Sequence, residues 1–555
     1  MHRVTREVAL WCAIAFLAGV PRLARLDFLL TNPEAATALV SLTVLRGEPS
    51  LFPNPLFGWL QALLFTVFGA SEVSARLVAA LSGVVLCLLP VALRLQLGRT
   101  RALIFAALLA FSPTLWFVSR EMGGAILAWM LAFAAHCAWR ARRPALAAAA
   151  FGALLATGQD AIPPLIVTVL ASSAALPLDA VRPSARTVAI VLLAFVLSAT
   201  ALLMRPTGLG DAFNGYALWA QTRGGDASIS VGRLMLGLVI SEPVIWLGAA
   251  FALAAFARMR AQLRAESAWW IWIAAGLGVL IVSAGRSAAL LAPLTIGMAG
   301  LASAAYDALL ASAQRWGSWR REGVVVAIAF VLLIYASLGV WQYAGQARSA
   351  WLASAVVAAL LIAALVAAGS LTMDYGAPLR GVALAGVAAL SLYTFGVGIQ
   401  MNHARPHNPA EPYRAQAADL DLMTLQEDIR LISVRATGEP NALDVHLAED
   451  APAALQWVLR DRRRFDALED AGAPDVVLTP AAEKPRVAGN FIGTAYAVTA
   501  QAPLNEVRCV GLPWGGGDCW SLARWLAFRD AETTHANLWV LWLRDDVARR
   551  ASGMR

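Results

Sequence analysis

An acidic side chain stands close to the start of the chain, in surroundings that are otherwise apolar or small. The run LLTNPEAATALVSLTVLRGE, residues 29–48, contains only the carboxylates Glu34 and Glu48, and Glu34 lies inside the helix-like segment PEAATALV. A carboxylate held in a fixed position can accept a proton or orient a nucleophile. What Glu34 does therefore depends on the elements that surround it.

Three arginines and a further acid add to the residues that could do chemistry. Arg120, Arg205 and Arg286 stand near the ends of apolar blocks, and the guanidinium group is well suited to phosphate oxygens. Arginines at such positions also commonly extend to the membrane surface without any ligand, and this alternative stays open for all three. Asp160 lies between two short apolar blocks, where an acid is costly unless it is paired or hydrated.

The composition of the elements around these residues identifies a polytopic membrane protein. Of 555 residues, 59% are hydrophobic and 14% are charged, and the mean hydropathy is +0.63. Soluble domains carry about 25% charged residues. Apolar blocks of about 20 residues, the length that crosses a bilayer, predict about thirteen spans. The expected spans lie near 8–25, 73–95, 101–118, 122–139, 144–157, 161–178, 187–204, 233–257, 268–284, 288–309, 323–343, 350–370 and 379–398.

The loops between these spans predict the orientation of the chain. Arginines are concentrated in the segments that face inward if the N-terminus is cytoplasmic, as the positive-inside rule requires. The first apolar stretch lacks a convincing cleavage site and indicates a retained span in the plasma (inner) membrane. The net charge is +8 and the pI is near 9.6. The arginines that produce this charge are spread between the spans and do not form one basic patch, so no nucleic acid is expected. An odd number of spans then places residues 399–555 outside.

Two outer loops and a C-terminal domain follow from this topology. The transmembrane domain is expected at 1–398, with a first outer loop at 26–72 and a second large one at 205–232. The apolar, Pro-broken block 54–69 predicts an interfacial helix on the membrane. Residues 399–440 are polar and predict a linker, and 441–555 alternate strand and helix patterns, which predicts a small extracytoplasmic α/β domain.

Two cysteines fall within that outer domain. Cys509 and Cys519 bracket the Gly-rich run VGLPWGGGD. In an oxidising compartment this spacing favours a disulfide, and two free thiols are the alternative.

Several stretches resemble the membrane glycosyltransferases of the C superfamily, most closely the branch called "flippase activity-associated". They are PEAATALVSLTVLRGE, NPLFGWLQALLFTVFGASEVSARL, FSPTLWFVSRE, RPTGLGDAFNGYALWAQTRGG, ISEP, MNHARPHNPAEPYRAQAADL and APAALQWVLRD. They occur in the order of the family and cover nearly the whole chain. The resemblance implies a helical bundle that transfers a sugar from a polyprenyl-phosphate-linked donor to a glycan or protein acceptor at the outer membrane face.

The resemblance also implies roles for individual residues. Glu34 aligns with the second acid of the family's Asp-Glu pair and becomes the candidate base, while Pro33 occupies the position of the Asp. The acid expected after the SR motif is absent at Ala125, and Glu121 is a shifted substitute. Substrate-binding candidates are Arg120, Arg205, Arg286, Asp160 and Glu121. No cofactor is expected; a divalent metal ion is not excluded, although no acids cluster visibly.

Two other functions compete with the enzyme. Because two of the family's acids are missing, a non-catalytic relative that binds lipid-linked sugar and assists surface-glycan export remains open. A transporter is disfavoured, since the chain shows no internal repeat with broken spans at corresponding positions. The sugar, the acceptor and the oligomeric state do not follow from the sequence.

Overall fold

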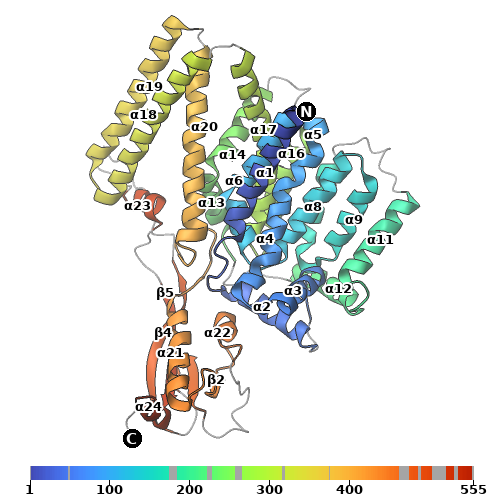
Figure 1. Cartoon of the computed structure of the whole chain (residues 1–555), viewed down its shortest axis with the longest axis vertical. Helices are drawn as coiled ribbons and strands as arrows, with labels where there is room; N and C mark the ends of the chain where they lie inside the picture. The colour runs from blue at the N-terminus through green and yellow to red at the C-terminus, as the bar shows by residue number, and fades with distance from the viewer. Residues whose placement is uncertain are drawn as a thin grey trace.

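The computed structural model describes residues 2–47, 51–173, 184–221, 228–256, 266–315, 319–373, 376–461, 474–484, 489–502, 520–529 and 535–552. Within these ranges a large helical bundle carries a small C-terminal domain at one end, and the N-terminus lies at the other end (Figure 1). The bundle helices are α1 (His2–Leu23), α4 (Glu72–Leu88), α5 (Arg94–Leu97), α6 (Arg99–Phe111), α7 (Pro113–Arg120), α8 (Ala125–Arg140), α9 (Pro144–Leu155), α10 (Ile162–Ser173), α11 (Ala185–Ala199), α13 (Val231–Ser241), α14 (Pro243–Phe256), α16 (Ser267–Val282), α17 (Ala292–Arg315), α18 (Trp319–Gln346), α19 (Leu352–Thr372) and α20 (Gly376–Ile399).

Among the described residues, five helical stretches are long and apolar enough to cross a membrane, or seven if two bent pairs each form one span. The pairs are α6 with α7, bent by 57°, and α13 with α14, bent by 89°. Each second helix begins with proline, which lacks the N–H that would continue the preceding helix. The other predicted spans fall on α1 and on the shorter apolar helices α8, α9, α10, α11 and α16. A multi-span helical protein is confirmed, and the number of thirteen stays a prediction.

Three helices cover the end of the bundle that faces the C-terminal domain: α2 (Asn32–Leu45), α3 (Pro55–Phe68) and α12 (Gly208–Gln221) (Figure 1). In α2, Thr31 and Glu34 form a capping box, and the Asn54 side chain caps α3 by accepting from the Phe57 amide at 3.0 Å. These caps satisfy amides that have no partner inside a helix. The structure thus has helices in the segment predicted as the first outer loop, and their place at the membrane surface stays a prediction.

The C-terminal domain is a mixed sheet with helices. Its elements are β1 (Ala417–Ala418), α21 (Asp421–Thr437), β2 (Val445–Leu447), α22 (Ala453–Val458), β3 (Val476–Pro480), β4 (Phe491–Gln501), α23 (Trp520–Phe528), β5 (His535–Arg544) and α24 (Asp545–Ser552). The strand order is β1-β4-β5-β3-β2, with β2 and β3 parallel and the other pairs antiparallel.

The predicted boundary of this domain was wrong. Residues 399–440 are not only a linker, because β1 pairs with β4 and α21 packs against β4 and α24. The polar composition that indicated a linker belongs to the exposed face of α21, whose opposite face buries Leu422, Leu425 and Ile429. The mixed α/β character of the domain is confirmed.

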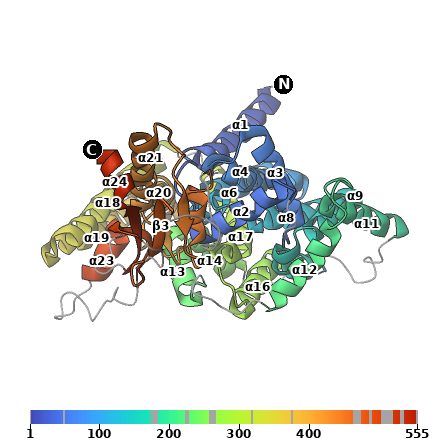
Figure 2. The same cartoon turned by 90° about the horizontal axis from the view of Figure 1, so that it is seen from below.

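Helix α22 attaches this domain to the first loop. The Ala454 amide donates to Asn32 Oδ1 at 3.1 Å, and Trp457 Nε1 donates to Glu72 Oε1 at 2.9 Å. The ring of Trp457 also contacts Phe65, with 6.0 Å between the centroids. Viewed from below, the sheet covers only one part of the bundle end (Figure 2). The domain is thus fixed beside the first loop and leaves part of that end uncovered.

Candidate active site

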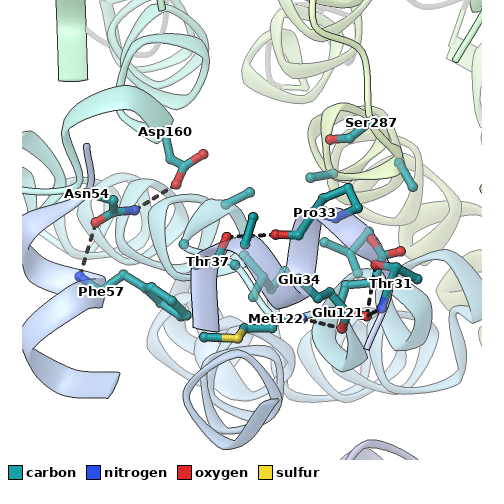
Figure 3. A pocket seen from close by; sticks show the side chains of 18 of the residues that line it. Thr31, Pro33, Glu34, Thr37, Asn54, Phe57, Glu121, Met122, Asp160 and Ser287 are labelled. Carbon is teal, nitrogen blue, oxygen red and sulfur yellow. Dashed lines mark hydrogen bonds between the residues drawn. The ribbon is translucent and has the colours of Figure 1, made fainter. Parts of the chain in front are cut away.

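A cavity of about 460 Å³ opens at this end of the bundle, between α2, the start of α3, the start of α8, the turn Gly158–Asp160 and residues 413–416 (Figure 3). Three acidic side chains line it: Glu34, Glu121 and Asp160. A single arginine, Arg414, is among the lining residues. The structure therefore brings together three of the residues that the sequence singled out, from three separate loops.

Glu34 is held by a buried ion pair with Arg76. Oε1 accepts from Arg76 Nε at 2.8 Å and from the Met122 amide at 2.8 Å. Oε2 accepts from Arg76 Nη2 at 2.8 Å and from both the amide and the hydroxyl group of Thr31, at 2.9 and 3.0 Å. Glu34 is 3% exposed and Arg76 is fully buried. Both oxygens are thus occupied by donors that fix them in place.

These contacts determine the charge of Glu34. Burial by itself raises the pKa of the carboxyl group, but the charge and hydrogen bonds of Arg76, with the amides of Thr31 and Met122, outweigh it, and the pKa lies below its ordinary value. A carboxylate stabilised in this way is a weak base. Glu34 is therefore better placed to hold α2, α4 and the start of α8 together than to accept a proton.

Glu121 has the opposite environment. It follows α7 directly, is half-buried at the cavity wall, and accepts no hydrogen bond on its side chain within the described part of the chain. Burial raises its pKa to about 8, and the negative charge of Glu34 adds to this, while Arg414 and Arg76 oppose it. Most Glu121 side chains therefore carry a proton at neutral pH and can donate a hydrogen bond into the cavity.

Asp160 is the third acid and stands across the cavity from Glu121 (Figure 3). Its Oδ2 accepts from Asn54 Nδ2 at 2.7 Å. Burial raises its pKa to about 6, and the hydrogen bond from Asn54 limits the rise. Most Asp160 side chains are thus ionised at neutral pH, with a pKa close enough to neutrality for proton transfer.

Backbone contacts fix Asp160 beside the first loop. The Gln159 amide donates to Pro53 O at 2.9 Å, and the Leu56 amide donates to Ala156 O at 3.1 Å. The backbone of Gly124 packs directly against this pair, because a Cβ at this position would lie 1.8 Å from Asn54 Nδ2 and 2.6 Å from Asp160 Oδ2. The backbone after Glu121 can approach the Asn54–Asp160 pair only because residue 124 has no side chain.

Arg414 supplies the positive charge of the cavity. It is 4% exposed, and its guanidinium carbon lies 4.9 Å from the centroid of the Phe117 ring. Its Nε is buried and has no hydrogen-bond partner among the described residues, where no ion pair to its side chain is found either. The nearby charges of Glu121 and Glu34 offset the cost of burying this cation only in part, so it favours an anionic ligand.

The three predicted arginines do not line the cavity. Arg120 is 1% exposed and donates to the carbonyl groups of Pro21 and Arg25, at the end of α1. Arg205 pairs with Asp211 at 3.2 Å, and Arg286 donates to Leu280 O and Ile281 O, both at 3.3 Å. None of the three therefore lies where it would bind a substrate in this cavity. Each interacts with its own loop or with a helix end instead.

Sequence reasoning missed Arg76 and Arg414 as site residues. Both lie inside stretches that carried the family resemblance, SARL and EPYRAQ, but Arg76 falls within the predicted span 73–95 and Arg414 within the predicted linker. Cys509 and Cys519 lie outside the described residues. Within the described ranges, no three His, Cys, Asp or Glu side chains converge closely enough to hold a metal ion.

Comparison with known proteins gives structural similarity without sequence similarity. No family model and no curated protein sequence matches the chain. The crystal structure of ArnT from Cupriavidus metallidurans in the apo state matches with a TM-score of 0.53 and 18% identity, covering 82% of this chain and 85% of ArnT. The same protein bound to undecaprenyl phosphate matches with a TM-score of 0.52 and 19% identity over the same shares. An oligosaccharyltransferase from Archaeoglobus fulgidus is more distant, with a TM-score of 0.43 and 13% identity over 82% of this chain and 64% of that one.

This similarity extends over most of both chains and includes the helical bundle. At these identities it shows the fold, and the narrower branch that the sequence resembles stays a prediction. The chain therefore shares the fold of ArnT, and its place among the membrane glycosyltransferases of the C superfamily stays a prediction.

Proposed function

We propose that the protein transfers a sugar from a polyprenyl-phosphate-linked donor to an acceptor hydroxyl or amide group, with the reaction centred in the cavity of Glu121, Asp160 and Arg414. The observation that carries the proposal is the unpaired, buried Arg414 guanidinium in a cavity that also contains two acids with raised pKa values. The fold supports it, and the undecaprenyl phosphate bound to ArnT has the headgroup chemistry that such a cavity suits.

The proposed reaction uses the two carboxyl groups differently. The ionised Asp160 accepts the proton of the acceptor as the acceptor oxygen or nitrogen attacks the anomeric carbon. The bond from the anomeric carbon to the phosphate oxygen breaks, and polyprenyl phosphate leaves with its second negative charge. Arg414 stabilises that charge, and protonated Glu121 donates a hydrogen bond to the phosphate or to a sugar hydroxyl group.

Glu34 has a positioning role in this proposal and does not act as the base. Its carboxylate accepts from Arg76 and from the Met122 amide, directly after Glu121. It thereby fixes the backbone that carries Glu121 into the cavity. This assignment replaces the one expected from the sequence, and it also fits the presence of Pro33 where the family has an acid.

A second candidate function is a non-catalytic relative that binds the lipid-linked sugar. The occupied oxygens of Glu34 favour it, since the residue that aligns with a family acid is not available for proton transfer. In this function Arg414 still binds the phosphate group, but Asp160 takes part in no reaction.

The test is transfer of labelled sugar from polyprenyl phosphate in membranes, with donor binding measured separately. Asp160→Asn should lower the transfer rate by about 10²–10⁴, the range for one positioned acid–base group, and leave donor binding unchanged. Arg414→Ala should weaken donor binding itself, and Arg414→Lys should restore part of it. Arg205→Ala, which alters an arginine outside the cavity, serves as the control. Normal transfer in Asp160→Asn would exclude Asp160 as the base, and donor binding without transfer in the wild type would favour the non-catalytic function.

A further inference from the structure

A second pocket lies on the side of the bundle, between α6, α14, α17 and α20. Its volume is about 290 Å³, room for about ten atoms the size of a water molecule. Its lining is almost entirely apolar: Ile104, Ala107, Leu108, Phe111, Val244, Ile245, Leu309, Leu310, Leu384 and Val387, with Glu242, Tyr306, Ser391 and Thr394 as the polar members. It shares no lining residue with the polar cavity. Two of the helices that form its walls, α17 and α20, are among the described helices long and apolar enough to cross a membrane.

Two residues of this lining carry a buried polar atom that has no partner among the described residues. Glu242 is fully buried, and its Oε1 accepts from the Ser112 hydroxyl group and from the Thr114 amide at 2.9 Å. Its Oε2 has no hydrogen-bond partner in the described part of the chain, and neither has Thr394 Oγ1, on a side chain that is 4% exposed. A buried polar atom without a partner costs free energy, so these atoms mark where a ligand with a polar group gains most.

We propose that this pocket binds a long-chain lipid alcohol. Its alkyl chain lies against the apolar wall of the pocket, and its hydroxyl group lies at Glu242 and Thr394. A hydroxyl group both donates and accepts, so it matches Glu242 whether or not the carboxyl group carries a proton, and it matches Thr394 as well. An ammonium head would only donate, and its charge is expensive at hydrocarbon depth. A phosphate head would meet the carboxyl group of Glu242 without a cation among the lining residues.

The experiment uses the full-length protein in lipid nanodiscs and a photoreactive 16-carbon alcohol as the probe, with adducts mapped by mass spectrometry. Labelling should fall on peptides from α6, α14, α17 or α20. Excess unlabelled 16-carbon alcohol should compete, and its methyl ether, which cannot donate a hydrogen bond, should compete about three- to tenfold less well, the weight of a single hydrogen bond.

Two variants locate the site. Thr394→Val should weaken labelling severalfold without loss of folding, because its hydroxyl group has no partner to lose. Thr168→Val is the matched control: that hydroxyl group is also buried and unpartnered, but it lies on α10 and does not line the pocket. Ala107→Phe should block labelling by filling the pocket.

Three outcomes would overturn the proposal. Equal competition by the alcohol and its ether would mean that the alkyl chain enters the pocket without recognition of the hydroxyl group. Stronger competition by the 16-carbon amine would assign a charged head instead. Labelling that survives Ala107→Phe would place the bound lipid elsewhere on the bundle.

Discussion

At the scale of single residues, two glutamates of one cavity have opposite charge properties. Glu34 is surrounded by donors and has a lowered pKa, whereas Glu121 lacks them and has a pKa of about 8. Burial raises the pKa of both, and the difference comes from the charge of Arg76 beside Glu34 and from the hydrogen bonds that Glu34 accepts. The division of roles proposed for the site follows from this contrast.

Glu34→Gln should destabilise the protein by about 3–5 kcal/mol, because it leaves the buried Arg76 charge without its anion. The measurement is thermal unfolding in detergent, with exposed Glu439→Gln as the control. Since the pKa of Glu34 is lowered in the folded state, its contribution is present above the ordinary glutamate pKa and is lost as pH falls through the folded value. Unchanged stability together with abolished transfer would return Glu34 to the role of base.

The transfer rate at low substrate concentration should depend on pH as a bell-shaped curve. It should rise as Asp160 ionises, with a pKa of about 6, and fall as Glu121 loses its proton, with a pKa of about 8. Glu121→Gln, which keeps a hydrogen-bond donor without titrating, should remove the fall at high pH and leave the rise. A curve that keeps both limbs in this variant would show that another group titrates near pH 8.

At the scale of elements, the site depends on loops that approach one another closely. The start of α3, the turn before α10 and the start of α8 meet at Asn54, Asp160 and Gly124. Pro113 and Pro243 break two spans of the bundle, and Glu242 accepts from the amide of Thr114 at the first break. It thereby fixes the start of α7, whose end delivers Glu121 to the cavity.

Gly124→Ala should therefore strongly reduce transfer, because the added methyl group displaces the Asn54–Asp160 pair. Gly123→Ala is a matched control on the adjacent residue, since a Cβ there meets nothing within 4 Å. Both variants should fold, which a melting curve checks. Equal transfer rates in the two variants would mean that the Asn54–Asp160 contact is not needed for the reaction.

At the scale of the whole molecule, the C-terminal domain lies at the same end as the helices of the first loop, opposite the N-terminus (Figure 1). The cavity is lined by α2 and the start of α3 and so belongs to this end. With the N-terminus cytoplasmic, as the arginine distribution predicts, the cavity and residues 399–555 face outward. Reporter fusions after α20 and at the C-terminus should then report an extracytoplasmic position. A cytoplasmic C-terminus would contradict this orientation and the proposed site of reaction.

If residues 399–555 face outward, Cys509 and Cys519 lie in an oxidising compartment, and we still expect a disulfide between them. If it forms, the bridge should stabilise the domain by about 2–4 kcal/mol. Mass spectrometry of peptides from the membrane-isolated protein, with and without reductant, checks it, and Cys12, a free and exposed cysteine of α1, is the internal control for alkylation. Alkylation of both cysteines without reductant would show two free thiols.

The sequence alone determined what depends on local composition. Hydropathy identified the multi-span bundle, the apolar block 54–69 predicted α3, and strand patterns predicted the mixed domain, because burial in lipid or in a sheet imposes a regular spacing on apolar residues. Glu34 and Asp160 were also identified beforehand, from their places among apolar residues, and Glu121 was identified from the family resemblance. Only the tertiary structure decided their roles. Arg76 lies 42 positions from Glu34 in the sequence, and Arg414 lines the cavity from the segment that follows α20. No local pattern records such long-range contacts, and they set the charge of each acid and determine which acid is free to react.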